Sequence, residues 1–283
     1  MTLVVFDLDG TLLDKDSRIS TYTAETLAKM RAHNIPYTVA TGRTLQAATG
    51  PLEDHHFTLP LILKNGAIIW SPEEARYSHH HLLTREEVWR VLAAFTLNEL
   101  TPFVFSLQPG QRHALYHGPL KSQSEHKLAN LFEAERELPL APLTSMPDEI
   151  SVINVFSLGS AEAVERVSAS IADEPHLVAY SGIAIHEREM GEHVTKEPAL
   201  HWIDIHHSLG SKGNGINHLR KELEIDHVIA FGDGDNDLSM FECASECYAP
   251  ANADPIILNA ADEIIGHHDE DGVARFLRKR FEL

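Results

Sequence analysis

The chain has 283 residues, 43% of them apolar and 23% charged, with a formal net charge of −19 when histidine is neutral. This length can bury the core of one large domain or of two modest ones, so disulfide bonds are not needed to hold the fold. The acidity argues against nucleic-acid binding, because apart from Arg278–Arg280 the sequence has no long basic run.

The sequence contains no recognisable targeting segment or membrane span. Met1–Phe6 is a short apolar run without a basic region before it, and Asp7 and Asp9 interrupt it. No apolar run approaches the roughly 18 residues of a transmembrane helix. We therefore expect a cytoplasmic protein without membrane or nucleic-acid partners, whose oligomeric state the sequence leaves open.

The first part of the chain alternates expected strands and helices. In chain order these are Leu3–Phe6, Thr23–His33, Pro36–Ala40, Thr44–Leu52 and Leu59–Leu63. Continuous apolar strands are typical of a parallel sheet that is buried on both faces. The alternation therefore predicts a parallel sheet with helices on its two faces.

After about His81 the pattern becomes that of an antiparallel α+β domain. The expected elements are helices 85–100, 122–136 and 161–171, strands 103–107, 114–117, 150–158 and 201–207, and a hairpin of 176–180 with 183–187 across Ser181-Gly182. The first pair of strands is expected to turn at Pro109-Gly110. Helices interleaved with hairpins predict a mixed, mainly antiparallel domain.

From Ser211 the first pattern returns. Lys212–Leu223 is an expected helix, His227–Phe231 an apolar strand, Asp237–Ala244 a helix, and Val273–Arg280 a final helix. The predicted fold is therefore α/β, with a Rossmann-like parallel-sheet core at residues 1–81 and 209–283 and an inserted α+β domain at 82–208.

Two acidic motifs follow two of the expected core strands. They are Asp7–Thr11, after the first strand, and Gly232–Asp237, after a later one. Ligands of open parallel sheets bind beyond the carboxyl ends of the strands, so neighbouring strands would bring these carboxylates together. Two like charges about 4 Å apart repel by roughly 4 kcal/mol at an effective dielectric near 20, which a divalent cation would offset. Oxygen ligands favour Mg²⁺, although either motif alone is also compatible with an ordinary Asp/Gly turn.

Two further motifs could provide positive potential for an anion. Thr41–Arg43 precedes an expected helix, where Thr41 could cap the helix and the free N–H groups could hold a phosphate oxygen. Ser211–Gly213 opens another helix, and Lys212 could neutralise phosphate. A plain helix cap and a solvated lysine are the alternatives.

Taken together, these four motifs resemble those of the haloacid dehalogenase superfamily, and within it the Cof-type sugar-phosphatase subgroup. Phe6–Thr11, Ala40–Arg43, Ser211–Gly213 and Gly232–Asp237 match its first to fourth motifs in order. Asn65–Ala67 and Asp269–Ala274 also resemble signatures of the subgroup. The resemblance implies an Mg²⁺-dependent phosphatase that hydrolyses small phosphate monoesters, such as sugar phosphates, with the inserted domain as a cap that selects the substrate.

The resemblance also implies a role for each motif residue. Asp7 would be the nucleophile, forming an aspartyl-phosphate, and a metal ligand. Asp9 would be the general acid and base, with its backbone carbonyl on the metal. Asp233 would be the second carboxylate ligand, and Asp237 would support the metal site from close by. The residues implied to hold the phosphate are Thr41, Gly42, Arg43, Lys212 and Asn236.

The resemblance leaves other functions open. A second aspartate at Asp9 is typical of phosphatases and phosphomutases, whereas transport ATPases have threonine there and dehalogenases lack it. A phosphomutase resembling phosphomannomutase therefore remains an alternative, as does a regulator that binds a phosphorylated ligand without turnover. No motif in 82–208 identifies the substrate.

Cysteine and histidine could in principle form a second metal site. Cys243 and Cys247 are four residues apart, which would place them on one helix face, but a single pair lacks half of a zinc site. We expect buried free thiols in a reducing compartment. The 19 histidines include runs at His55-His56, His79–His81, His206-His207 and His267-His268, which we expect to be solvated loop residues.

Overall fold

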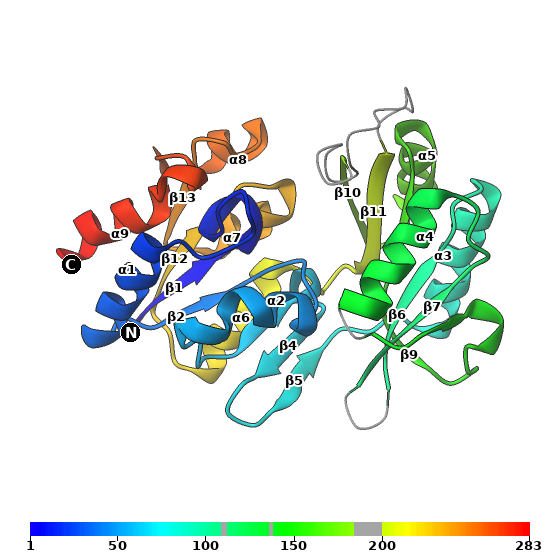
Figure 1. Ribbon diagram of the computed structural model, residues 1–283, viewed down its shortest axis with the longest axis horizontal. Coiled ribbons are helices and arrows are strands. Elements are labelled where there is room, and N and C mark those ends of the chain that lie inside the picture. The colour runs from blue at the N-terminus through cyan, green and yellow to red at the C-terminus, as the bar shows by residue number, and fades with distance from the viewer. Residues whose placement is uncertain (109–111, 136–137, 184–199) are drawn as a thin grey trace. The chain divides into compact units, whose positions relative to one another are not determined.

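The computed structural model describes residues 1–108, 112–135, 138–183 and 200–283. The chain divides into two compact units, Met1–His80 with Leu209–Leu283 and His81–Ser208, which we call the core unit and the inserted unit. Within the described ranges, no helix is both long and apolar enough to cross a membrane. Figure 1 shows the elements of each unit along the chain.

The core unit contains two sheets. Its strands are β1 (Thr2–Phe6), β2 (Tyr37–Val39), β3 (Leu61–Leu63), β4 (Ile68–Ser71), β5 (Arg76–His80), β12 (His227–Phe231), β13 (Glu246–Pro250) and β14 (Glu263–Ile265). Its helices are α1 (Thr21–Ala32), α2 (Leu45–Leu52), α6 (Lys212–Glu222), α7 (Leu238–Cys243), α8 (Pro255–Ala260) and α9 (Gly272–Phe281).

The main core sheet has five parallel strands in the order β14-β13-β12-β1-β2. Its strands, except the edge strand β14, are buried on both faces because alternate side chains enter two apolar layers. On one face of the sheet, Val5 packs in an apolar layer that includes residues of α6 and α7. On the other face, the rings of Phe6 and Phe231 are in contact. Phe276 of α9 packs on this second face, and α1 lies beside α9 (Figure 1). The predicted α/β fold with a parallel core is confirmed.

The expected third parallel strand is shorter and pairs differently. β3 belongs to a separate antiparallel sheet, β3-β4-β5, and touches the main sheet through an isolated parallel bridge between Ala40 and Ile62. The reason is a tight turn at Lys64–Gly66, which folds the chain directly back onto β3. The β4–β5 hairpin was not predicted, although Ile68–Trp70 is a short apolar run before a turn.

The inserted unit has one six-stranded sheet in the order β10-β11-β9-β6-β7-β8. The strands are β6 (Phe103–Leu107), β7 (His113–His117), β8 (Leu140–Pro142), β9 (Ser151–Ser160), β10 (Leu177–Ile183) and β11 (Leu200–His207). All pairs are antiparallel except β7 with β8. The helices are α3 (Arg85–Leu97), α4 (Gln123–Asn130) and α5 (Ala161–Ile171).

The predicted hairpin across Ser181-Gly182 is wrong. β10 runs straight through both residues and pairs with β11, so that Gly182 lies opposite Trp202. A Cβ on Gly182 would lie 3.0 Å from the Trp202 indole nitrogen, so the glycine makes room for the ring and does not form a turn. Residues 184–187, the expected second strand, lie outside the described residues, as does the expected turn at Pro109-Gly110.

The two cysteines do not share a helix face. Cys243 is the last residue of α7, the backbone becomes extended at Ala244, and Cys247 lies in β13. Both are free thiols, as expected, but only Cys247 is buried and Cys243 is half-buried.

Burial raises the pKa of both Cys243 and Cys247 to about 11. At pH 8 we therefore expect iodoacetamide to alkylate them about 100-fold more slowly in the native protein than in the urea-unfolded chain, because only the thiolate reacts. Peptide mass spectrometry at timed intervals measures both rates. Equal rates in the two states would contradict the burial of these thiols.

Candidate active site at the carboxyl ends of the core strands

The two acidic motifs meet because β1 and β12 are parallel neighbours. Phe6 and Phe231, the last residues of these strands, are in register. The N–H of Asp7 donates to the Phe231 carbonyl at 2.8 Å, which fixes the start of the first motif beside the second. Asp7 and Asp233 thus emerge at the same edge of the sheet.

The turn after Asp7 closes over the second motif. Gly10 has φ of +74°, and a Cβ there would overlap the Asp233 carboxylate, so this position requires glycine. The Thr11 hydroxyl donates to Asp233 Oδ1 at 2.9 Å, and Asn252 Nδ2 donates to the Gly10 carbonyl at 2.8 Å. Sequence reasoning missed Thr11 and Asn252 as supports of this turn.

Lys212 lies between two carboxylates in the buried part of the site. Ser211 caps the N-terminus of α6, so Lys212 is the first helical residue, and its side chain is fully buried. Its Nζ donates to Asp7 Oδ1 at 2.6 Å and also to Asp237 Oδ1. Asp237 Oδ2 accepts the N–H groups of Asp233 and Gly234 at 2.8 and 3.1 Å. Both oxygens of Asp237 are therefore engaged.

The buried charges shift one another's pKa values. Burial raises the pKa of Asp7 well above its usual range; Lys212 opposes this, while Asp237 and Asp233 add to it. Burial, reinforced by the charge of Asp237, raises the pKa of Asp233 to about 6. Burial would lower the pKa of Lys212, but the charges of Asp237 and Asp7 outweigh it, and the pKa is raised. The site thus contains one cation, Lys212, whose charge is stabilised, and more carboxylates than that single cation can neutralise.

This donor set fits a hard divalent cation. Oxygen atoms of Asp7, Asp233 and Asp237 lie within 4.8 Å of one another. Asp7 and Asp233 each keep one carboxylate oxygen outside the hydrogen bonds described above, whereas Asp237 does not. A cation would also relieve the repulsion that raises the pKa values of Asp7 and Asp233. The residues therefore suit a metal held by Asp7 and Asp233, with Asp237 as a buttress.

The Thr41–Arg43 segment lies after β2, next to this group. Thr41 is buried, but it does not cap α2 as predicted; Thr44 does, by accepting the Ala47 N–H at 3.3 Å, because the helix starts at Leu45. The Thr41 hydroxyl instead accepts the Arg43 N–H at 3.2 Å.

Arg43 and Asp9 form an ion pair that the sequence did not suggest. Arg43 Nε and Nη2 donate to the two carboxylate oxygens of Asp9 at 2.7 and 2.5 Å, and Nη1 donates to the Ala47 carbonyl. The Asp9 side chain is 57% exposed, unlike that of Asp7. Arg43 is therefore engaged with Asp9 and is not a free phosphate ligand in this arrangement.

Asn236 lies opposite Asn65, a residue to which the sequence analysis assigned no role. Its Nδ2 donates to Asn65 Oδ1 at 2.9 Å. Asn65 is buried in the turn after β3, and its carboxamide oxygen also lies close to Gly42. The dipeptide Asn65-Gly66 after an apolar strand was the available signal for this turn.

The histidine runs do not all lie in solvated loops as expected. His206 is fully buried in β11, and the rings of His79 and His218 stack at 4.1 Å within the core unit. His267, His268 and Asp269 lie close enough to bind a metal, and one side-chain atom of each also bonds the backbone. His268 Nδ1 lies 2.8 Å from the Leu13 carbonyl oxygen. His267 Nδ1 accepts the Asp269 N–H at 3.2 Å, and Asp269 accepts the Lys15 N–H at 2.6 Å.

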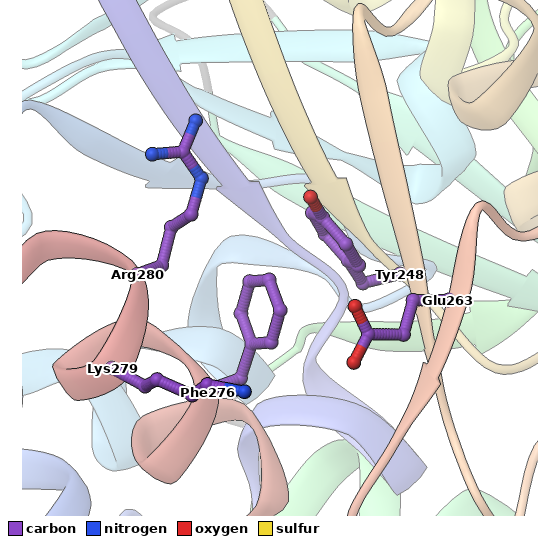
Figure 2. Close-up of a pocket in the computed structure, with 5 residues that line it drawn as sticks. All are labelled: Tyr248, Glu263, Phe276, Lys279 and Arg280. Atoms are coloured by element: carbon purple, nitrogen blue, oxygen red, sulfur yellow. The ribbon is translucent and has the colours of Figure 1, made fainter.

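A separate pocket lies between α9 and the strands β13 and β14. Figure 2 shows its lining residues, Tyr248, Glu263, Phe276, Lys279 and Arg280. Arg280 pairs with Glu246 at 3.0 Å, and the Tyr248 hydroxyl donates to the same carboxylate at 2.5 Å. No residue of the four motifs lines this pocket, so it is not part of the candidate active site.

Comparisons with known proteins agree with this geometry. The sequence model of the haloacid dehalogenase-like hydrolases matches residues 4–277. The chain is 25% identical to the 5-amino-6-(5-phospho-D-ribitylamino)uracil phosphatase YitU of Bacillus subtilis, over 99% of this chain and 98% of that one. It is 26% identical to the pyridoxal phosphate phosphatase YbhA of Escherichia coli, over 97% of each chain. A solved haloacid dehalogenase-like hydrolase from B. subtilis has the same fold, with a TM-score of 0.77, 23% identity, and coverage of 98% of this chain and 99% of that one.

Proposed function

Because the chain belongs to the haloacid dehalogenase-like hydrolase family, we propose that it hydrolyses small phosphate monoesters through an aspartyl-phosphate on Asp7. The resemblance to this superfamily and to its Cof-type subgroup is confirmed, as is the class of phosphoric monoester hydrolase. Beyond the family and the enzyme class, we propose the role of each site residue, the metal that they bind and the class of substrate.

One observation supports the mechanism most strongly. Asp7 is a buried carboxylate whose Oδ1 accepts from Lys212 Nζ at 2.6 Å, and a carboxylate oxygen of Asp7 lies within 4.8 Å of one of Asp233. A nucleophilic carboxylate must be held in place and kept ionised, and a nearby cation favours ionisation. Lys212 supplies the first such cation.

The reaction then has two balanced steps. The free carboxylate oxygen of Asp7 attacks phosphorus, the bond to the leaving oxygen breaks, and Asp9 gives that oxygen its proton. Asp9, now ionised, takes a proton from water, whose oxygen attacks phosphorus, so that phosphate leaves and Asp7 is regenerated. Asp9 is exposed enough to exchange protons with substrate and water, but Arg43 engages both of its oxygens in this arrangement, so this pair must open before Asp9 carries the proton for the leaving oxygen.

Separate groups would bind the metal and the phosphate. Asp7, the backbone carbonyl of Asp9, and Asp233 would hold Mg²⁺, with Asp237 as support. When bound, the ion neutralises phosphate charge during transfer. The net charge of −19 makes local positive groups necessary for an anionic substrate. The residues proposed to hold the phosphate are Thr41, Gly42, Lys212 and Asn236, with Arg43 acting on Asp9.

Metal binding should weaken in acid because a proton on Asp233 competes with the cation. The raised pKa of Asp233, about 6, means that this carboxyl is mostly protonated at pH 5 and ionised at pH 7.5. We expect Mg²⁺ to bind about tenfold more weakly at pH 5 than at pH 7.5. Isothermal titration calorimetry measures both constants. An affinity that does not change over this interval would contradict the assignment of Asp233 as a ligand.

The substrate is proposed to be a small phosphorylated metabolite. The relatives described above are named as phosphatases of a phosphoribitylamino-uracil and of pyridoxal phosphate, both small molecules. We propose that residues 82–208, which closely match the inserted unit, are the cap that selects among such substrates. A cytoplasmic location, where these metabolites occur, is part of the same proposal.

A metabolite panel tests the proposed function against its two alternatives. Free phosphate and isomerised sugar phosphate are measured together, with Mg²⁺ and with EDTA. Hydrolysis predicts stoichiometric phosphate release that requires the metal. An excess of isomer over phosphate would indicate a phosphomutase, and binding without turnover of any compound would indicate a regulator.

A further inference from the structure

The geometry points to Asn65 as a positioning residue of the phosphate site. We infer that the turn Lys64–Gly66 fixes the spacing of three loops around the phosphate, and that the Asn65 side chain orients Asn236. This inference rests on the proposed function, because it concerns how that site holds its phosphate.

The backbone of this turn adopts an unfavourable conformation. Lys64, Asn65 and Gly66 have φ values of +48°, +56° and +95°, the left-handed region that side chains other than hydrogen disfavour. Lys64 and Asn65 are 6% and 3% exposed, so the turn lies inside the protein. Such strained backbone persists where its surroundings over-determine it, and it clusters at functional sites.

The turn is tied first to the Thr41–Arg43 loop. The Lys64 N–H donates to the Arg43 carbonyl at 3.0 Å, and the Asn65 N–H donates to the Thr41 carbonyl at 2.9 Å. A Cβ on Gly42 would lie 3.1 Å from Asn65 Oδ1. The loop proposed to hold phosphate oxygens is therefore held in place by two backbone hydrogen bonds to this turn.

The turn also touches the start of α6. A Cβ on Gly66 would overlap the Ser211 carbonyl and lie 3.1 Å from the Lys212 nitrogen. Glycine is required here for its φ and for this close approach. The distance between the turn and the helix that begins with Lys212 is thus set by backbone contact.

The third contact is made by the Asn65 side chain. Asn65 Oδ1 accepts from Asn236 Nδ2 at 2.9 Å, although the two residues are 171 positions apart. This bond fixes which end of the Asn236 carboxamide faces Asn65, and leaves its second N–H for the phosphate. Without the acceptor, the carboxamide can rotate, and its N–H is no longer preoriented.

The variant Asn65→Gly separates the side chain from the backbone. Glycine accepts the left-handed φ but has no acceptor for Asn236. The matched control is Asn34→Gly, because Asn34 has the same φ of +56° but is exposed in the loop before β2. We expect Asn65→Gly to weaken inorganic phosphate binding and to lower kcat/KM for 4-nitrophenyl phosphate by about tenfold each. Its melting temperature should fall further than that of Asn34→Gly, because a buried hydrogen bond is lost, so phosphate affinity is compared at a temperature where both variants are folded.

A double-mutant cycle with Asn236→Ala decides whether Asn65 acts through Asn236. We expect the tenfold effect of Asn65→Gly on phosphate binding to disappear in the Asn236→Ala background. An equal effect in both backgrounds, or unchanged phosphate affinity in Asn65→Gly alone, would overturn the inference.

The outcomes also separate this inference from the proposed function. If the wild type turns over in an Asp7-dependent way and Asn65→Gly has no effect, only the inference about Asn65 is overturned and the proposed function stands. Absence of turnover in the wild type removes the proposed function, and phosphate binding measured by calorimetry still decides the role of Asn65.

Discussion

Replacing Asp7 by asparagine is expected to lower kcat by on the order of 10⁴-fold or more, the largest effect in the protein. A carboxamide has nearly the same shape as a carboxylate but is not a nucleophile, so no phosphoryl group can be transferred to it. Phosphate release from 4-nitrophenyl phosphate under single-turnover conditions measures the loss.

The same variant should not unfold the protein. Burial raises the pKa of Asp7, so its charged form costs more free energy in the folded protein than in the unfolded chain, whereas asparagine has no charge to desolvate. We expect a melting temperature without metal at least equal to that of the wild type. Asp16→Asn, an exposed aspartate on the loop before α1, is the control and should keep full activity. An Asp7→Asn protein that folds and still turns over would refute the role of Asp7.

Replacing Lys212 by methionine is expected to destabilise the fold by about 3–5 kcal/mol and to abolish activity. Lys212 is 1% exposed and bonds both Asp7 and Asp237, so its removal leaves two buried carboxylates without their cation. Methionine keeps much of the side-chain volume, which isolates the loss of charge from the creation of a cavity. Urea unfolding at pH 7.5 without added metal measures the free energy.

Lys221→Met is the matched control, because Lys221 is an exposed lysine on the same helix. A change within about 0.5 kcal/mol is expected there, as is usual for surface substitutions. Equal stabilities for the two variants would show that Lys212 does not hold the carboxylates together.

The site could be anticipated from the sequence where backbone topology determines it. Leu3–Phe6 and Val228–Phe231 are apolar throughout, and parallel strands that are buried on both faces lie in the middle of a sheet. Motifs that directly follow such strands share an edge, so Asp7 and Asp233 could be expected to meet. Lys212 could be placed there only through the family resemblance, because the helix that it opens does not follow a core strand in the sequence.

Contacts between side chains far apart in the sequence could not be anticipated. The Arg43–Asp9 pair joins residues 34 positions apart, and neither residue type dictates its partner. The role of Gly182 depends on Trp202, which lies opposite it only because β10 and β11 pair in this register. Asn65 stood out only as part of a segment that resembles a subgroup signature, and its contact with Asn236 follows from packing and not from any local pattern.

The most direct test of the account is to trap the phosphorylated enzyme. In Asp9→Asn the base for the second step is missing, whereas 4-nitrophenolate leaves without a proton, so the intermediate should accumulate. Acid quenching after mixing with 4-nitrophenyl phosphate and Mg²⁺, followed by peptide mass spectrometry, locates the phosphoryl group. One phosphoryl group is expected on Asp7, and none when Asp7 is also replaced by asparagine. Turnover without a phosphorylated Asp7, or a phosphoryl group on another residue, would contradict it.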